Sequence, residues 1–190
     1  MLVNDYRDGF SSVDGKPEPG MRKAIEYAVA QGHRRLGFVT GDLRYRNAVD
    51  RLAVFRALIG EFELQSVIVE GNFSRTSGYR CAGQLLSARD RAPTMVMASN
   101  DREAVGVLDY CREHGLHVPG DVSVIGYDNL DPAADVTPPL STVDNQVMKT
   151  GQEAARLLCE ALDGAVKQPV TRWLDTGFVV RQSTGACRAR

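Results

Sequence analysis

The sequence predicts an α/β fold in which a parallel sheet is covered by helices on both faces. Along the central part of the chain, short β-prone apolar runs alternate with amphipathic helical segments. The chain has 190 residues, of which 43% are hydrophobic, enough to bury one sizeable core. Alternating strands and helices imply right-handed crossovers between parallel strands, and hence a three-layer sandwich.

Four apolar runs are predicted to form the strands of this sheet, at residues 35–41, 66–71, 94–99 and 122–128. The helices between them are predicted at residues 20–31, 47–61, 75–88 and 101–114. They follow from the helical spacing of apolar residues, as in the stripe formed by Val49, Leu52, Phe55 and Leu58. Gly115 is expected to end the last of these helices as a C-cap.

Beyond residue 128 the regular alternation ends. Asp131 before Pro132 predicts a one-turn helix, and Pro138-Pro139 predicts an extended path. A long helix over 146–163 and two short strands, at 170–174 and 178–183, are expected to follow. The first fifteen residues hold only a short strand segment, so we expect both this segment and the long helix to need a packing partner.

Composition excludes several classes of protein. The 23 basic and 24 acidic residues nearly cancel and form no basic cluster, which argues against direct nucleic-acid binding by this chain. The four cysteines are scattered, without the close pairs of a zinc site or the density of a disulfide scaffold. Neither a signal peptide nor a membrane-spanning apolar run is present. We therefore expect a cytoplasmic protein with reduced thiols, no bound metal and no membrane partner.

Polar side chains gather where the predicted strands end. In an open parallel sheet, ligands bind beyond the carboxyl ends of the strands. The residues at that edge are Thr40, Gly41 and Asp42, then Asn72 and Phe73, then Ser99, Asn100 and Asp101, and finally Tyr127, Asp128 and Asn129. This mixture of hydrogen-bonding groups and aromatic rings suits a small polar ligand with an apolar face, such as a sugar or a nucleobase.

Each candidate also has a purely structural explanation. Asn100, with Glu103 three residues later, fits a helix cap. Phe73 alone fits a loop aromatic that packs on the core, and Arg51 fits a solvated charge. Asp128 has no such local role, because Asp131 is expected to cap the next helix. Its carboxylate is therefore predicted to be free to accept two hydroxyl hydrogen bonds.

No set of residues predicts catalysis. The sequence has no Gly-x-Ser-x-Gly elbow, no phosphate-binding glycine loop ending in Lys-Ser/Thr, and no dinucleotide-binding glycine fingerprint. We therefore favour a binding protein over an enzyme and expect no cofactor.

The order of these motifs resembles the effector-binding region of lactose-repressor (LacI/GalR) family transcription regulators. The resemblance runs from residue 12 to residue 184 and is most specific in VPGDVSVIGYDN, at 118–129, and PPLSTV, at 138–143. It implies a type I periplasmic-binding-protein-like body of two α/β subdomains, joined by three crossovers, with the effector in the cleft between them.

The resemblance also implies roles for individual residues. The family pattern places effector contacts at Arg51, Phe73, Asn100 and Asp128. Asp101 and Glu103 would then serve the helix start while Asn100 faces the ligand. Further candidates for effector contact are Arg46, Asn47 and Asn145. Arg51 and Asp128 suit vicinal hydroxyls and Phe73 suits stacking, so a sugar is favoured over a purine.

By analogy with the family, residues 16–145 and 175–184 form a nearly complete C-terminal subdomain. Residues 1–15 and 146–174 are expected to be remnants of the N-terminal subdomain, and 185–190 a tail. The family's helix-turn-helix has no counterpart in this sequence, so DNA binding is expected only in a longer form. A homodimer is expected, with a contact surface around Tyr79, Leu108 and Val136.

Two alternatives remain open at this point. A solute-binding protein that feeds a transporter shares the fold, although the absence of a signal peptide and the unpaired cysteines count against it. The chain could also act as a truncated dimerisation module without DNA binding.

Overall fold

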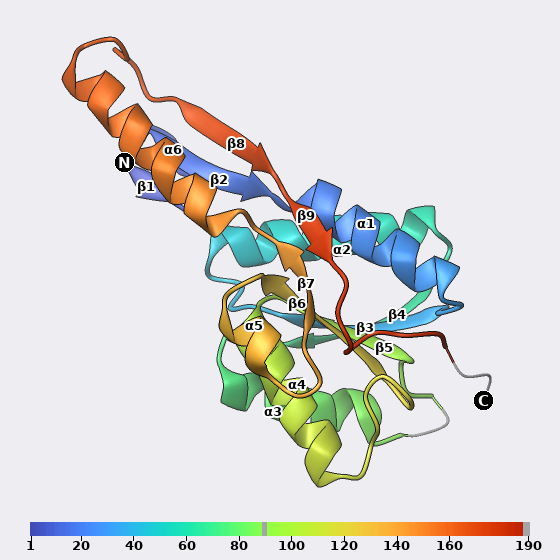
Figure 1. The fold of residues 1–190 in the computed structure, drawn as a ribbon. Helices are drawn as coiled ribbons and strands as arrows, with labels where there is room; N and C mark the ends of the chain where they lie inside the picture. The colour runs from blue at the N-terminus through green and yellow to red at the C-terminus, as the bar shows by residue number, and fades with distance from the viewer. Residues whose placement is uncertain (89–90, 188–190) are drawn as a thin grey trace.

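The computed structural model describes residues 1–88 and 91–187. Its larger sheet has six strands in the order β4-β3-β5-β6-β7-β9, all parallel to their neighbours except β9, which runs antiparallel to β7 (Figure 1). The strands are β3 (Arg35–Thr40), β4 (Gln65–Glu70), β5 (Met95–Ala98), β6 (Ser123–Asp128), β7 (Ser141–Asp144) and β9 (Gly177–Val179).

Helices cover both faces of this sheet, which confirms the predicted sandwich. One face is covered by α1 (Pro17–Ala30) and α2 (Arg46–Glu61), the other by α3 (Arg75–Leu86) and α4 (Asp101–Glu113). Successive residues of a strand point to opposite faces. In β5, Met95 and Met97 pack with α1 and α2, whereas Val96 and Ala98 pack with α3 and α4.

The ends of the helices follow their capping residues. Pro17 stands in the first turn of α1, which begins three residues earlier than predicted because Pro is favoured there. The Ser74 hydroxyl caps α3 by accepting from the Ser77 amide at 3.1 Å. Gly115 follows α4 with a φ of +67°, as expected for a C-cap glycine.

A second, three-stranded sheet lies beyond one end of the large sheet (Figure 1). Its parallel strands are β1 (Leu2–Val3), β2 (Ser12–Lys16) and β8 (Thr171–Asp175), in that order. Helix α6 (Val147–Leu162) packs against it through Ala154 and Leu157, which contact Val13 in a small core. The N-terminal residues therefore hold two strands, more than the single short segment predicted from the sequence.

The structure corrects two further predictions in the last third of the chain. Strand β7 was not predicted as a strand, although it pairs with β6 over its whole length. The predicted strand at 178–183 ends at Val179, because the next amides bond elsewhere. Arg181 N donates to the Ser141 hydroxyl at 2.8 Å and Ser183 N to Pro139 O at 3.0 Å, in place of a regular ladder. The one-turn helix is confirmed as α5 (Pro132–Asp135).

Three crossovers connect the two sheets and meet side by side. They are the β2–α1 junction, the β7–α6 junction and the single residue between β8 and β9, Thr176. The Thr176 hydroxyl donates to Lys16 O at 2.7 Å and accepts from Gly20 N at 2.8 Å. A Cβ at Gly15 would overlap the Asn145 side chain, so the three segments are tightly packed. The division of the chain into subdomains at these crossovers stays a prediction.

The exposure of two surfaces bears on the predictions made from the sequence. Leu108 is only 6% exposed and packs in the core, so the predicted contact surface around Tyr79, Leu108 and Val136 cannot include it. On α6, Leu158 is 47% exposed and Leu162 is 78% exposed, as is Met148. This α6 stripe (Met148, Leu158, Leu162) is apolar and uncovered. Among the described residues, no helix is both long and apolar enough to cross a membrane.

Candidate ligand-binding site

Arg51 is the central side chain at the carboxyl edge of the large sheet. It lies in the second turn of α2 and is only 6% exposed, so it is not an ordinary solvated charge. Its Nη1 donates to Ser99 O at 2.6 Å, and its guanidinium carbon lies 3.7 Å from the centre of the Tyr127 ring. Its Nη2 lies 3.6 Å from the Asp128 carboxylate. Arg51 thus joins α2 to the ends of β5 and β6.

Asp128 ends β6 with a φ of +113°, a conformation that costs free energy for a residue with a Cβ. Its side chain is 22% exposed. Burial raises the pKa of Asp128 to about 6, although the charge of Arg51 and a hydrogen bond from Asn145 both act to lower it. Asp128 is therefore a paired carboxylate and not the free one predicted. Asp131 makes no capping hydrogen bond, so that premise was also wrong.

Asn100 and Phe73 lie next to each other and are bonded. The Asn100 side chain caps α4 by accepting from Glu103 N at 2.8 Å, as predicted, and its Nδ2 donates to Phe73 O at 3.0 Å. Phe73 is half-buried, with a φ of +68°. Its ring covers Gly41, where a Cβ would overlap it, and lies 6.2 Å from the Tyr45 ring, centroid to centroid.

Asp101 and Glu103 both stand in the first turn of α4, as predicted, and their carboxylates also bond to neighbouring segments. Asp101 accepts from the Thr142 hydroxyl at 2.6 Å and from Leu130 N at 2.9 Å. Glu103 Oε1 accepts from the amides of Asn72, at 3.0 Å, and Phe73, at 2.8 Å. The two acids thus hold the loops that surround the site.

The further candidates lie at the rim of the site. Arg46 Nε donates to the Tyr6 hydroxyl at 2.8 Å. Asn47 donates to Asn4 O at 3.5 Å. The side-chain oxygens of Asn47 and Asn145 are buried without a hydrogen-bond partner among the described residues. They therefore retain the capacity to bond to a ligand.

Sequence reasoning missed Asp14, a buried carboxylate on β2. It lines a void of about 10 Å³ together with Asn47, Asp50 and Arg51, and also with Gly15, Pro17, Tyr127 and Trp173. Burial raises the pKa of Asp14 to about 6. No local signal marks this residue, because its place depends on the pairing of β2 with the distant β8.

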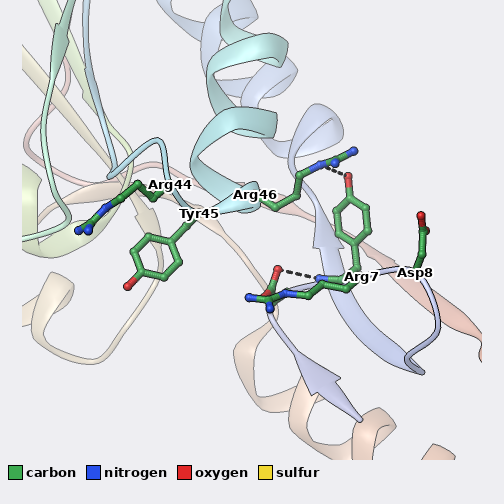
Figure 2. A pocket seen from close by; sticks show the side chains of 7 residues that line it. Arg7, Asp8, Arg44, Tyr45 and Arg46 are labelled. Atoms are coloured by element: carbon green, nitrogen blue, oxygen red, sulfur yellow. Dashed lines mark hydrogen bonds and ion pairs between the residues drawn. The ribbon is translucent and has the colours of Figure 1, made fainter.

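A larger hollow of about 360 Å³ adjoins the site. Figure 2 shows Arg44, Tyr45 and Arg46, from the loop before α2 and its first turn, on one side of the hollow. Arg7 and Asp8 lie on the other side, and Asp5 and Tyr6 complete the lining. Charged groups of both signs and two aromatic rings can thus approach a polar molecule. Within residues 1–88 and 91–187, no three His, Cys, Asp or Glu side chains come together as a metal-ligand set.

Comparison with known proteins identifies the class to which this fold and site belong. The sequence model of the periplasmic binding protein-like domain matches residues 25–184, so the chain belongs to this family. Among solved structures, the dimeric lac repressor with a C-terminal deletion superposes with a TM-score of 0.90 at 28% identity, covering 98% of this chain and 68% of the repressor. A LacI family transcriptional regulator from Enterococcus faecium, solved with bound ribose, gives 0.88 at 28% identity and covers 98% and 70%.

Comparison with curated relatives narrows the class of protein further. The HTH-type transcriptional repressor PurR of Escherichia coli O1:K1 / APEC is 35% identical over 163 residues, which are 84% of this chain and 48% of the repressor. PurR of Haemophilus influenzae is 29% identical over 191 residues, 96% of this chain and 56% of the repressor. Within the periplasmic binding protein-like class, the chain is thus the effector-binding region of a LacI-type protein, as the motifs indicated. It spans about half the length of the curated relatives it matches.

Proposed function

We propose that this chain is the ligand-sensing part of a LacI-type transcriptional regulator. In the complete protein, a small effector binds in the cleft between two subdomains and alters how a dimer binds DNA. The observation that carries this proposal is the buried Arg51, fixed by Ser99, Tyr127 and Asp128 at the carboxyl edge of the sheet. The relatives are transcriptional repressors and not enzymes, which supports a binding function.

We assign effector contact to Arg51, Phe73, Asn100 and Asp128, with Arg46, Asn47 and Asn145 at the rim. These groups differ in the hydrogen bonds they have left to offer. The side-chain oxygen and nitrogen of Asn100 are both bonded within the protein. Asp128 is partly exposed, and the side-chain oxygens of Asn47 and Asn145 are unpartnered. We therefore assign the direct polar contacts to Asp128, Asn47 and Asn145, while Phe73 supplies an apolar face.

A neutral sugar fits this site better than a purine. The carboxylates of Asp14, Asp50 and Asp128 accept hydrogen bonds from hydroxyl groups, which a sugar carries in large number. Two relatives were solved with sugars, ribose in the Enterococcus faecium regulator and cellobiose in the regulator CelR. The PurR relatives keep a purine as the second candidate.

The remaining assignments concern the complete protein. We place it in the cytoplasm as a homodimer, because a lac repressor relative is a dimer. We place DNA contact in a helix-turn-helix, because the curated relatives are named HTH-type repressors. The exposed α6 stripe favours a second candidate, a dimerisation module that packs on a longer regulator. Recovery of the chain from its own cells without a longer homologue would count against that candidate.

The test is a binding screen on the 190-residue chain with D-ribose, cellobiose, guanine and hypoxanthine. A ligand that binds the folded state increases the free energy of unfolding by mass action and so raises the midpoint temperature of thermal unfolding. We expect a shift with a sugar and a smaller or no shift with the purines. A shift with a purine alone would reverse the ligand assignment, and isothermal titration without heat for any of the four would remove the chain from this role.

A further inference from the structure

The loop between β4 and α3 is bound to the start of α4 through both peptide groups of one residue. The Phe73 N–H donates to Glu103 Oε1 at 2.8 Å, and the Phe73 carbonyl accepts from Asn100 Nδ2 at 3.0 Å. The preceding amide, that of Asn72, donates to the same Glu103 oxygen at 3.0 Å. A single carboxylate oxygen thus holds two consecutive amides of this loop.

Glu103 holds this loop from a fully buried position. Its exposure is 0%, and its second oxygen, Oε2, has no hydrogen-bond partner in the described part of the chain. Burying an unpaired carboxylate oxygen costs free energy, which an apolar side chain at the same place would not. A Cβ at Gly71 would overlap Glu103 Oε1, and a Cβ at Gly78 would overlap its backbone carbonyl. The surrounding chain is therefore built closely around this residue.

Phe73 needs such a restraint. Its φ of +68° is in the left-handed region, which is costly for a residue with an aromatic side chain. The same backbone directs its ring over Gly41, where the ring takes the space that a Cβ would occupy. Without the bonds to α4, the loop would relax towards an ordinary conformation and the ring would leave that position.

We propose that Glu103 is a positioning residue of the effector-binding face, which holds the peptide of Phe73 and thereby fixes its ring over Gly41. The importance of this ring for effector binding rests on the proposed function above. The positioning of Phe73 by Glu103 rests only on the hydrogen bonds, burial and backbone conformation of this chain.

The chemistry of the carboxyl group gives this role a distinct signature. An ionised carboxylate accepts stronger hydrogen bonds than a neutral acid or an amide. Burial raises the pKa of Glu103 to about 7, while the bonds from Phe73 and Asn72 and the charge of Arg51 act to lower it. The other titratable group coupled to this carboxyl is the buried Cys81 thiol, whose pKa is raised mainly by burial. The hold on the loop should thus tighten as the pH rises through about 7.

Nuclear magnetic resonance of the 190-residue chain tests this without any ligand. In the wild type, we expect the amide protons of Asn72 and Phe73 to titrate with one shared midpoint near pH 7. Glu103→Gln keeps an acceptor oxygen but cannot titrate, so the shared midpoint should vanish while the contact between the Phe73 ring and Gly41 persists. Glu113→Gln, at the exposed end of the same helix, is the matched control and should behave as the wild type.

Glu103→Ala removes the acceptor as well. We expect hydrogen exchange of the two amides to speed up by about tenfold or more, as for loss of a bond to a charged group, and the Phe73–Gly41 contact to disappear. An unchanged contact in this variant, or a shared midpoint that survives in Glu103→Gln, would overturn the proposal. If the alanine variant does not fold, the glutamine variant still decides. Absence of binding for all four ligands of the screen would count against the proposed function and leave this result untouched.

Discussion

The buried charge of Arg51 organises the candidate site. This one positive charge does not hold the two neighbouring carboxyl groups in their ionised form. Two carboxylates lie within its influence, Asp128 at 3.6 Å and Asp14 in the adjoining void. The pKa of each is raised to about 6 despite the attraction of the guanidinium. The effect of burial on the pKa of the two carboxyl groups therefore outweighs the effect of the Arg51 charge. Both carboxyl groups thus favour binding a proton or accepting from a hydrogen-bond donor.

Asp14 allows a direct test of this balance. Its pKa in the folded chain, about 6, is above the ordinary value of 3.8, so folding favours the protonated form. The stability linked to this proton is fully present below about pH 4 and is lost as the pH rises through 6. Asp14→Asn should therefore be more stable than the wild type at pH 8, by about 3 kcal/mol, and the difference should shrink towards pH 4. Urea unfolding at both pH values measures it, with the exposed Asp135→Asn as control. Equal differences at the two pH values would contradict the assignment.

Asp128 is the residue whose loss should separate binding from folding. In the complete regulator, we expect Asp128→Ala to abolish the response to effector, because it removes a partly exposed acceptor and leaves Arg51 without its ion pair. The overall fold should persist, since the Asp128 side chain is partly exposed and is not part of the hydrophobic core. Operator release on addition of effector measures the response, and circular dichroism the fold. A normal response in a folded variant would refute the site assignment.

At the scale of single elements, the sequence predicted those whose signal is local. Strands β3 to β6 are short apolar runs, and α1 to α4 carry apolar residues at helical spacing, so each could be read in isolation. Strand β7 has only four residues, and β2 gains its place by pairing with residues about 159 positions away in the chain. Such pairing has no local signature. For the same reason the place of Asp128 at the end of a strand could be read from the sequence, whereas the place of Asp14 and the bonds of Glu103 to the β4–α3 loop could not.

The contact between α3 and α4 yields a prediction about packing. A Cβ at Gly78 in α3 would overlap the backbone carbonyl of Glu103 in α4, so the two helices would have to separate. We expect Gly78→Ala to lower the free energy of unfolding by about 1–3 kcal/mol. Gly151 in α6 has no atom within 4 Å of such a Cβ, so Gly151→Ala should instead stabilise, by up to about 1 kcal/mol. Urea unfolding of the two variants measures both signs, and a harmless Gly78→Ala would refute the close packing.

For the whole molecule, the uncovered apolar stripe of α6 is the main departure from a well-sealed surface. Leu158 and Leu162 would bury apolar area in any association that covers α6. We expect the chain to self-associate at high concentration, and the double variant Leu158→Lys, Leu162→Lys to associate less. Sedimentation velocity over a concentration series measures this. Gln84→Lys in α3 with Gln168→Lys, both exposed, adds the same charge away from the stripe and should leave association unchanged. Equal loss in both double variants would show that charge, and not apolar contact, is responsible.

The three crossovers determine which relative motions of the two sheets remain available. A single flexible connection would leave the small sheet free to twist, swing and slide, and a ligand held between the sheets would have to arrest all of these movements. Here Gly15 lies against both Asn145 and Thr176, and the Thr176 hydroxyl bonds to the β2–α1 segment at Lys16 O and Gly20 N. Three short connections held side by side restrict these movements more than a single connection would. A ligand that brings the sheets together therefore loses little of its binding free energy to ordering them, and the direction of the resulting motion is set before the ligand arrives.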